Sequence, residues 1–258
     1  MGNSYDFHEG DLQDRDAGIA GAATLAAGPA SAAQYIITYT GSVTGGIDRT
    51  GVFGGGTDVD LTGASYTAVY TLTAPLAGAD SGGNGISAYI RGGAQTGTLS
   101  PVSGVFTIGG VSLGIGGDWF GSAEQANGFP GSGTDVVSHF AKDSVNTTSR
   151  YVNNAMSNTV RSNVNNIVGT SDYTDSLSYR VQADDTAQGS FVVNSFDRVG
   201  GGEVNRRAVS LVLDVDSVTI APFAVGTVPE PGTWALFIIG FGAIGAGMRR
   251  RKVGVAFA

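Results

Sequence analysis

Short runs of alternating apolar and polar residues, separated by glycine doublets, are the feature that most constrains the fold of this chain. Four such runs are rich in β-branched and aromatic side chains. They occupy residues 35–40, 65–72, 102–108 and 210–220. A period of two sends successive side chains to opposite faces of a strand. The pattern therefore predicts strands that each turn one face toward a core.

Glycine supplies 42 of the 258 residues, more than twice its usual share of about 7%. Doublets and triplets lie among the predicted strands, where glycine permits the positive φ angles of tight turns. They begin at residues 45, 54, 82, 92, 109, 116 and 200. Short strands with frequent turns predict an all-β domain, an antiparallel β-sandwich or jelly roll.

The stretch from residue 151 to 168 fits two structures. Its members Val152, Met156, Val160 and Val164 recur every four residues, which suits one face of a helix. They also share one parity, which suits one face of a strand. Asparagine is frequent in this stretch and disfavours helix interiors. We therefore expect strands here, with a short helix as the alternative.

Composition excludes several classes of function. The chain has 14 Lys and Arg against 22 Asp and Glu, a net charge of -8, so no basic footprint for nucleic acid is present. Cysteine is absent, which excludes disulfides, Cys-ligated zinc and a thiol nucleophile. Between the two ends of the chain His139 is the single histidine, too few for a histidine metal site. We expect His139 at an exposed loop or sheet position, and a chain that is not an enzyme.

Three zones follow one another near the C-terminus. Pro229, Glu230 and Pro231 precede an uncharged apolar run at 234–248, and four cations occupy 249–252. The prolines favour a helix that starts after Pro231. Fifteen residues span only about 22 Å of the ~30 Å hydrocarbon core, so snorkelling arginines or local thinning would complete the span. We expect a single transmembrane helix with its C-terminus in the cytoplasm.

This segment resembles the PEP-CTERM sorting signal in its PEPxxWA form. The residues that carry the resemblance are Pro229, Glu230, Pro231, Trp234, Ala235, Arg249, Arg250 and Arg251. The resemblance implies an exported protein of a Gram-negative cell envelope, surface or biofilm matrix, held transiently in the inner membrane. It also implies association with exopolysaccharide and processing by an exosortase, for which Pro229, Glu230, Pro231 and Trp234 are substrate determinants rather than catalytic groups.

The N-terminal region supplies part of a signal peptide. A weak apolar stretch at 18–27 precedes Ala30 and Ala32, which match a small-x-small cleavage pattern. Residues 1–16 hold five acidic residues and one basic residue, whereas a signal peptide needs a positive start. A wrongly assigned translation start, or an indel that replaced the basic segment, would explain the missing positive charge. The alternative to a signal peptide is a disordered acidic tail before an Ala-rich helix.

The predicted organisation has four parts. An acidic stretch with an atypical signal peptide occupies 1–33, the β domain 34–227, the sorting signal 228–252 and a cytoplasmic tail 253–258. No cofactor is expected, apart from a possible calcium ion. The predicted function is that of an exported structural or exopolysaccharide-associated protein without catalytic residues. A carbohydrate-binding module, which a calcium ion would assist, and a glycan hydrolase with two facing carboxylates are the alternatives.

Two short motifs in the β domain are candidates for ligand binding. Asp118 beside Trp119 predicts a sugar platform, because a ring stacks on a pyranose and a carboxylate accepts hydroxyl hydrogen bonds. Packing of Trp119 in the core is the alternative. Asp184 and Asp185 lie in a predicted turn and could bind calcium, which accepts carboxylate and carbonyl oxygens.

Asp214 and Asp216 share one face of the last predicted strand, with Val215 between them on the other face. We expect both carboxylates to face solvent.

Overall fold

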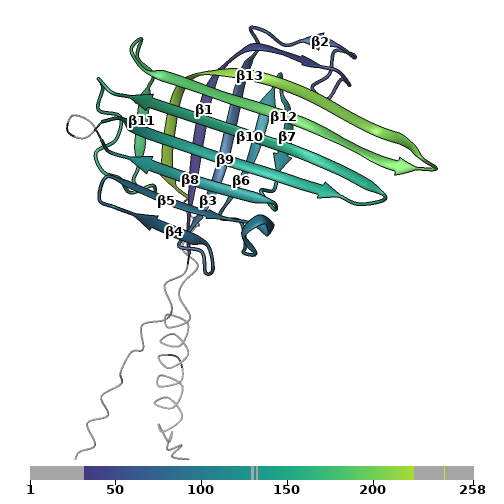
Figure 1. Cartoon of the computed structure of the whole chain (residues 1–258). Coiled ribbons are helices and arrows are strands. Elements are labelled where there is room, and N and C mark those ends of the chain that lie inside the picture. The colour runs from purple at the N-terminus through teal and green to yellow at the C-terminus, as the bar shows by residue number, and fades with distance from the viewer. Residues whose placement is uncertain (1–31, 129–130, 132, 224–240, 242–258) are drawn as a thin grey trace, which may run out of the picture. The chain divides into compact units, whose positions relative to one another are not determined.

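The alternating runs of the sequence lie in strands of one antiparallel sheet, shown in Figure 1. The computed structural model describes residues 32–128, 131, 133–223 and 241. Its strands are β1 Ala33–Asp48, β2 Val59–Asp60, β3 Ser65–Ala74, β4 Asp80–Gly83, β5 Ser87–Gly92, β6 Val102–Ile108, β7 Val111–Ile115, β8 Phe120–Ala126, β9 Asp135–Asn146, β10 Arg150–Ser162, β11 Leu177–Arg180, β12 Thr186–Val199 and β13 Gly202–Pro222. One turn of 3-10 helix, η1, spans Ala94–Thr96. The predicted runs lie in β1, β3, β6 and β13, and the all-β prediction is confirmed.

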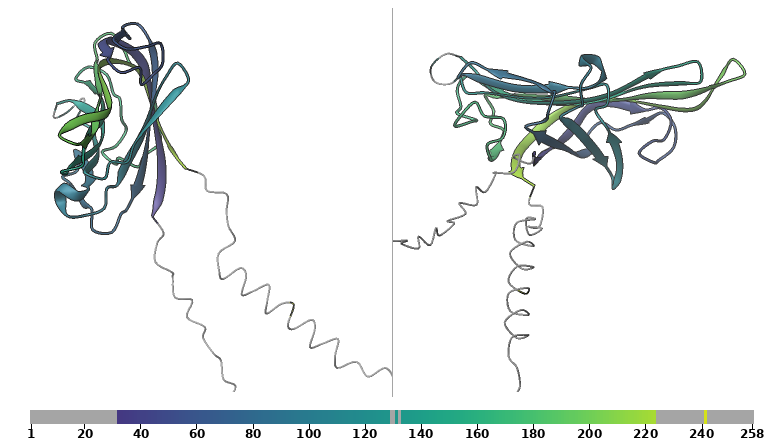
Figure 2. Two further views of the ribbon diagram at one scale, coloured as in Figure 1. Left: turned by 90° about the vertical axis from the view of Figure 1, so that its right-hand side faces the viewer. Right: turned by 90° about the horizontal axis from the view of Figure 1, so that it is seen from below.

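The two layers of the domain come from one continuous sheet that curls back over itself (Figure 2). The strand order is β4-β5-β8-β9-β10-β12-β13-β1-β3-β6-β7, with β11 beside β13 and β2 beside β1. Strand β13 pairs with β12 over 202–213 and with β1 over 209–222. It therefore passes from the layer of β12 to the layer of β1.

Aromatic side chains join the two layers in the core. Phe106 of β6 stacks on Phe191 of β12 with ring centroids 4.1 Å apart, and both rings are fully buried. Tyr66 stacks on the same Phe106 ring at 5.3 Å. Met156 of β10 packs so closely on Gly104 of β6 that an added Cβ would lie 2.5 Å from the sulfur. These contacts are made by the inward-facing residues of strands such as β3 and β6, in which buried residues alternate with less buried ones.

Glycine has two roles in this sheet. At Gly109 and Gly110 the φ angles are 57° and 85°, and the pair makes the predicted turn between β6 and β7. The turns predicted at 45–46 and 82–83 are wrong, because those glycines lie inside β1 and β4. In β1 the register against β13 shifts between Val43 and Gly45, so the doublet lies at a bulge where the sheet bends.

The ambiguous stretch at 151–168 is mainly a strand. Strand β10 runs from Arg150 to Ser162, and its residues Val152, Met156 and Val160 are buried on one face. Residues 163–168 are neither helix nor strand. The preference for strands is confirmed, and the helical alternative is wrong.

Candidate functional site

The histidine of the β domain lies in its core. His139 is in β9, where Val137, His139 and Ala141 alternate inward, and only 1% of its surface is exposed. The hydroxyl oxygen of Tyr39 lies 2.7 Å from its Nδ1 atom. Of the predicted loop or sheet position the structure shows the sheet, but the predicted exposure is wrong, because the register of β9 sends odd-numbered residues into the core.

Buried hydroxyl and amide groups surround this histidine. The Tyr70 hydroxyl donates to Oδ1 of Asn158 at 2.9 Å, and Nδ2 of Asn158 donates to the Tyr66 hydroxyl at 3.0 Å. Burial lowers the pKa of His139 to about 3 and raises the pKa of Tyr39 well above its usual value. The imidazole is therefore neutral at neutral pH and serves the packing of the core.

Asp118 and Trp119 lie side by side at the surface between β7 and β8. The Asp143 carboxylate accepts hydrogen bonds from the backbone N–H groups of Gly116, at 3.0 Å, and Asp118, at 3.1 Å. The Trp119 backbone N–H donates to the carbonyl of Lys142 at 3.0 Å. Trp119 is 36% exposed, so its ring is not enclosed in the core as the alternative supposed. Sugar binding by this pair stays a prediction.

Asp185 is a structural carboxylate of the turn before β12. It accepts hydrogen bonds from the Tyr179 hydroxyl at 2.6 Å, the Gln182 backbone N–H at 2.8 Å and Nδ2 of Asn165 at 2.9 Å. Partial burial alone would raise its pKa, but these hydrogen bonds outweigh burial and lower the pKa of Asp185 below 3.8. Its neighbour Asp184 is exposed.

A surface depression of about 540 Å³ brings Asp185 near the exposed carboxylates of Asp214 and Asp216, which face solvent as predicted. Arg180 lines the same depression. Among the residues that the structure describes, no three Asp, Glu, His or Cys side chains gather as metal ligands. Calcium binding at Asp184 and Asp185 stays a prediction.

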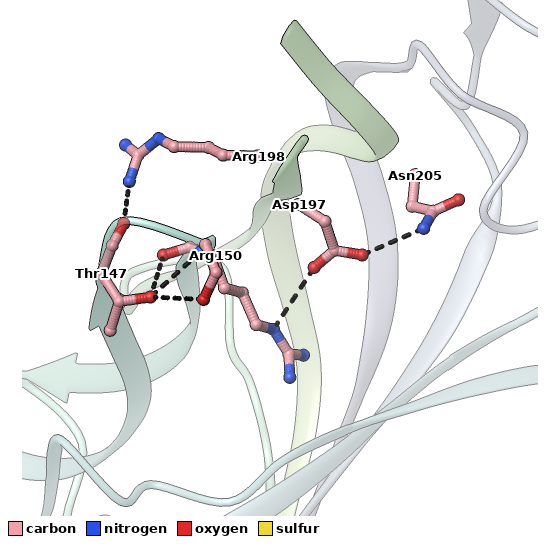
Figure 3. Close-up of polar contacts among 6 residues, drawn as sticks. Thr147, Arg150, Asp197, Arg198 and Asn205 are labelled. Atoms are coloured by element: carbon pink, nitrogen blue, oxygen red, sulfur yellow. Dashed lines mark hydrogen bonds and ion pairs between the residues drawn. The ribbon is translucent and has the colours of Figure 1, made fainter. Parts of the chain in front are cut away.

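The paired ends of β9, β10, β12 and β13 extend past the other strands as an arm (Figure 1). Figure 3 shows how the two hairpins join at its tip: Arg198 donates to the Thr147 carbonyl, and Arg150 forms an ion pair with Asp197. Within the β12–β13 hairpin, Asn205 also donates to Asp197. On the arm the rings of Tyr151 and Phe196 stack at 5.0 Å, with the Arg198 guanidinium 5.3 Å from the Phe196 ring. The contacts of Arg198 with Thr147 and of Arg150 with Asp197 join the two hairpins, and sequence reasoning missed them because these partners are about 50 positions apart.

A second depression, here called the β5–β8–β9 groove, has a volume of about 320 Å³. Its lining consists of Tyr89, Arg91, Phe120, Ser122, Ala123, Glu124 and Ser138. Sequence reasoning missed this groove, although Phe120 directly follows the predicted Asp118 and Trp119. Strand alternation was the available signal, because it separates Phe120 from Trp119 and groups it with Ser122 and Glu124.

The predicted sorting and cleavage residues lie outside the described part of the chain, except Ala32, which is exposed. They are Ala30, Pro229, Glu230, Pro231, Trp234, Ala235, Arg249, Arg250 and Arg251. The predicted transmembrane helix lies outside it as well. In the part of the chain that is described, no helix is long and apolar enough to cross a bilayer.

Comparison with known proteins supports the C-terminal prediction. A family model described as the PEP-CTERM protein-sorting motif matches residues 227–252, nearly the interval predicted from the sequence. No curated protein and no solved structure matches the chain. The chain therefore carries the sorting motif of PEP-CTERM proteins at residues 227–252.

Proposed function

We propose that this chain is a non-enzymatic protein of the cell surface or extracellular matrix that associates with exopolysaccharide. The PEP-CTERM motif carries the proposal, because it marks a sorted, exported protein that an exosortase processes. The last strand, β13, ends at Pro222 and the motif begins at residue 227. All the strands of the described residues thus precede the motif, as expected for a cargo domain followed by its sorting signal.

The buried position of His139 supports the proposal that the protein is not an enzyme. A surface general base needs an accessible group that titrates near the working pH. The His139 side chain is buried, its Nδ1 lies 2.7 Å from the Tyr39 hydroxyl, and its pKa is lowered to about 3 by burial. The histidine of the domain is thus committed to the core.

Hydroxyl groups on the outward face of β9, β10 and β12 support association with a hydrated polysaccharide. The hydroxyl oxygens of Ser138 and Thr159 lie 2.9 Å apart, as do those of Ser157 and Ser190. These residues alternate with the buried side chains of Val137, Asn158 and other core residues. Each hydroxyl both donates and accepts hydrogen bonds, as sugar hydroxyls do.

Delivery is tested by replacing Pro229, Glu230 and Pro231 with alanine in the native host. We expect the wild-type protein outside the cytoplasm in processed form and the variant retained at full length with the inner membrane. Replacement of Val253, Gly254 and Val255 by alanine is the matched control and leaves delivery unchanged. Equal delivery of the Pro-Glu-Pro variant and the wild type would contradict the proposal.

Matrix association is tested in a host strain that makes no exopolysaccharide. We expect the processed protein to move from the matrix fraction to the culture medium in that strain. Purified exopolysaccharide added back should return it to the matrix fraction. A distribution that is the same with and without exopolysaccharide would contradict this part of the proposal.

A further inference from the structure

Strands β5, β8 and β9 are neighbours in the sheet (Figure 1). The β5–β8–β9 groove lies on their outward face. Tyr89 is paired with Glu124 in register, Arg91 with Ser122, and Glu124 with Ser138. Residues paired across antiparallel strands share a face of the sheet, so these side chains meet at one surface. The residues between them, among them Ile90, Ala123 and His139, are buried in the core.

The aromatic part of the groove is held in place by its neighbours. The Phe120 ring packs on Phe140 with centroids 5.9 Å apart. The Arg91 guanidinium lies 5.0 Å from the centre of the Tyr89 ring, and its Nε and Nη2 atoms are each 2.7 Å from Oδ2 of Asp80. A ligand that stacks on Tyr89 or Phe120 therefore meets rings whose freedom is already reduced, which lowers the entropic cost of binding.

The polar part of the groove has free hydrogen-bonding capacity. Among the described residues the exposed Glu124 carboxylate has no hydrogen-bond or ion-pair partner, and neither has the Ser122 hydroxyl. A carboxylate accepts hydrogen bonds at two oxygens, and a serine hydroxyl both donates and accepts. The groove thus combines two aromatic rings with an unpaired acceptor and an unpaired hydroxyl.

We propose that the β5–β8–β9 groove binds a pyranose unit of a neutral polysaccharide. Aromatic faces carry negative partial charge and attract the polarised C–H groups on the apolar face of a sugar ring. Glu124 and Ser122 hydrogen-bond to its hydroxyls. The volume of about 320 Å³ is near the lower end of the roughly 300–1,000 Å³ typical of ligand pockets, which suits one sugar ring.

Charge in the groove selects a neutral chain over an acidic one. Arg91 is neutralised by Asp80, so the unpaired charge among the lining residues is the negative charge of Glu124. Lys142, opposite Phe120 in β9, is not among the lining residues. A uronic acid carboxylate would therefore be repelled at the position where a neutral sugar presents hydroxyls. The inference rests on the proposed association with exopolysaccharide and names its site and ligand class.

The test uses the full chain in mild detergent micelles and isothermal titration calorimetry. The probes are neutral hexasaccharides of glucose, mannose and galactose, with hexagalacturonate as the charged comparison. We expect saturable binding of at least one neutral hexasaccharide and at least about tenfold weaker binding of hexagalacturonate. Failure of all the neutral probes, or equal binding of the charged one, overturns the proposal.

Variants then locate the site. Tyr89→Ala, Phe120→Ala and Glu124→Gln should each weaken binding of the neutral probe by about tenfold. Tyr89→Phe keeps the ring and should retain binding. Phe196→Ala removes a ring that stacks on Tyr151 outside the groove, and it should bind as the wild type does.

Folding is checked by circular dichroism for each variant. Glu124→Gln alters an exposed carboxylate without a partner, so it tests the groove even where loss of a ring disturbs the fold. Groove variants that fold and bind as the wild type does overturn the assignment. If the protein reaches the matrix and the groove variants bind normally, this inference fails while the proposed function stands. If the protein stays in the cytoplasm, the proposed function fails whatever the groove binds.

Discussion

At the scale of the residue, His139 shows how strand register decides the role of a titratable group. Its neighbours Ser138 and Phe140 are only partly buried, whereas His139 is almost fully buried beside Tyr39. The sequence around it left a loop and a sheet position open, and the residue lies in β9. Exposure was predicted wrongly, because a polar residue at an inward position looks like an outward one until its buried partner, 100 residues away, is known.

His139 makes the stability of the domain depend on pH. Its pKa falls from 6.5 to about 3 on folding, so between these values the unfolded chain binds a proton that the folded chain does not. The contribution of His139 to the free energy of unfolding is therefore greatest above pH 6.5 and should fall by about 1.4 kcal/mol per pH unit between pH 6.5 and about 3. Asp60 and Asp185 have pKa values lowered from 3.8 and contribute at lower pH.

The measurement is urea unfolding at about pH 6.5, 5.5 and 4.5 for the wild type, His139→Phe and Tyr39→Phe. His139→Phe should lose most of the pH dependence in this window. Tyr39→Phe removes a buried hydroxyl, which costs about 1–3 kcal/mol, but keeps the histidine and its pH dependence. Equal slopes in the wild type and His139→Phe would contradict the assignment.

At the scale of the element, β1 is the strand whose shape depends most on glycine. It pairs with both β13 and β3, and its register against β13 shifts at two places. An added Cβ on Gly41 would lie 2.0 Å from the carbonyl oxygen of Asp214, and one on Gly46 would lie 2.2 Å from that of Ser210. These glycines allow the backbones of β1 and β13 to approach closely where the sheet bends.

Substitution in β1 tests this role. Gly41→Ala forces Cβ against the backbone of β13, and we expect a loss of about 2 kcal/mol or more in the free energy of unfolding. Gly45→Ala is the matched control, because an added Cβ at Gly45 has no atom within 4 Å. Thermal unfolding of the wild type and both variants measures the loss of stability that each substitution causes. A Gly41→Ala protein as stable as Gly45→Ala would show that the bend does not need glycine.

Individual strands could be predicted from the sequence far better than their pairing. The period of two is local, so the runs in β1, β3, β6 and β13 were found from their own residues. Glycine doublets were ambiguous, because the same residue makes the turn at Gly109 and the bulge at Gly45. The pairing of β1 with β13 joins residues as far apart as Tyr35 and Pro222, and neither strand carries a sequence pattern that identifies its partner.

At the scale of the whole molecule, the sorting motif was predictable and the groove was not. The motif is a contiguous stretch whose Pro-Glu-Pro, apolar and arginine zones follow one another in the sequence, and the family match covers the same residues. The groove assembles from Tyr89, Phe120 and Ser138, which come from three strands. Its residues become neighbours only once β5, β8 and β9 are paired in register.

The central claim is that the C-terminal segment anchors the protein transiently in the inner membrane, where an exosortase recognises and processes it. Mass spectrometry of the intact protein from its native host, after cell fractionation, tests this most directly. We predict a chain that ends near residues 229–231 and is found outside the cytoplasm. A full-length chain that still carries Arg249, Arg250 and Arg251 in a soluble cytosolic pool would contradict the account.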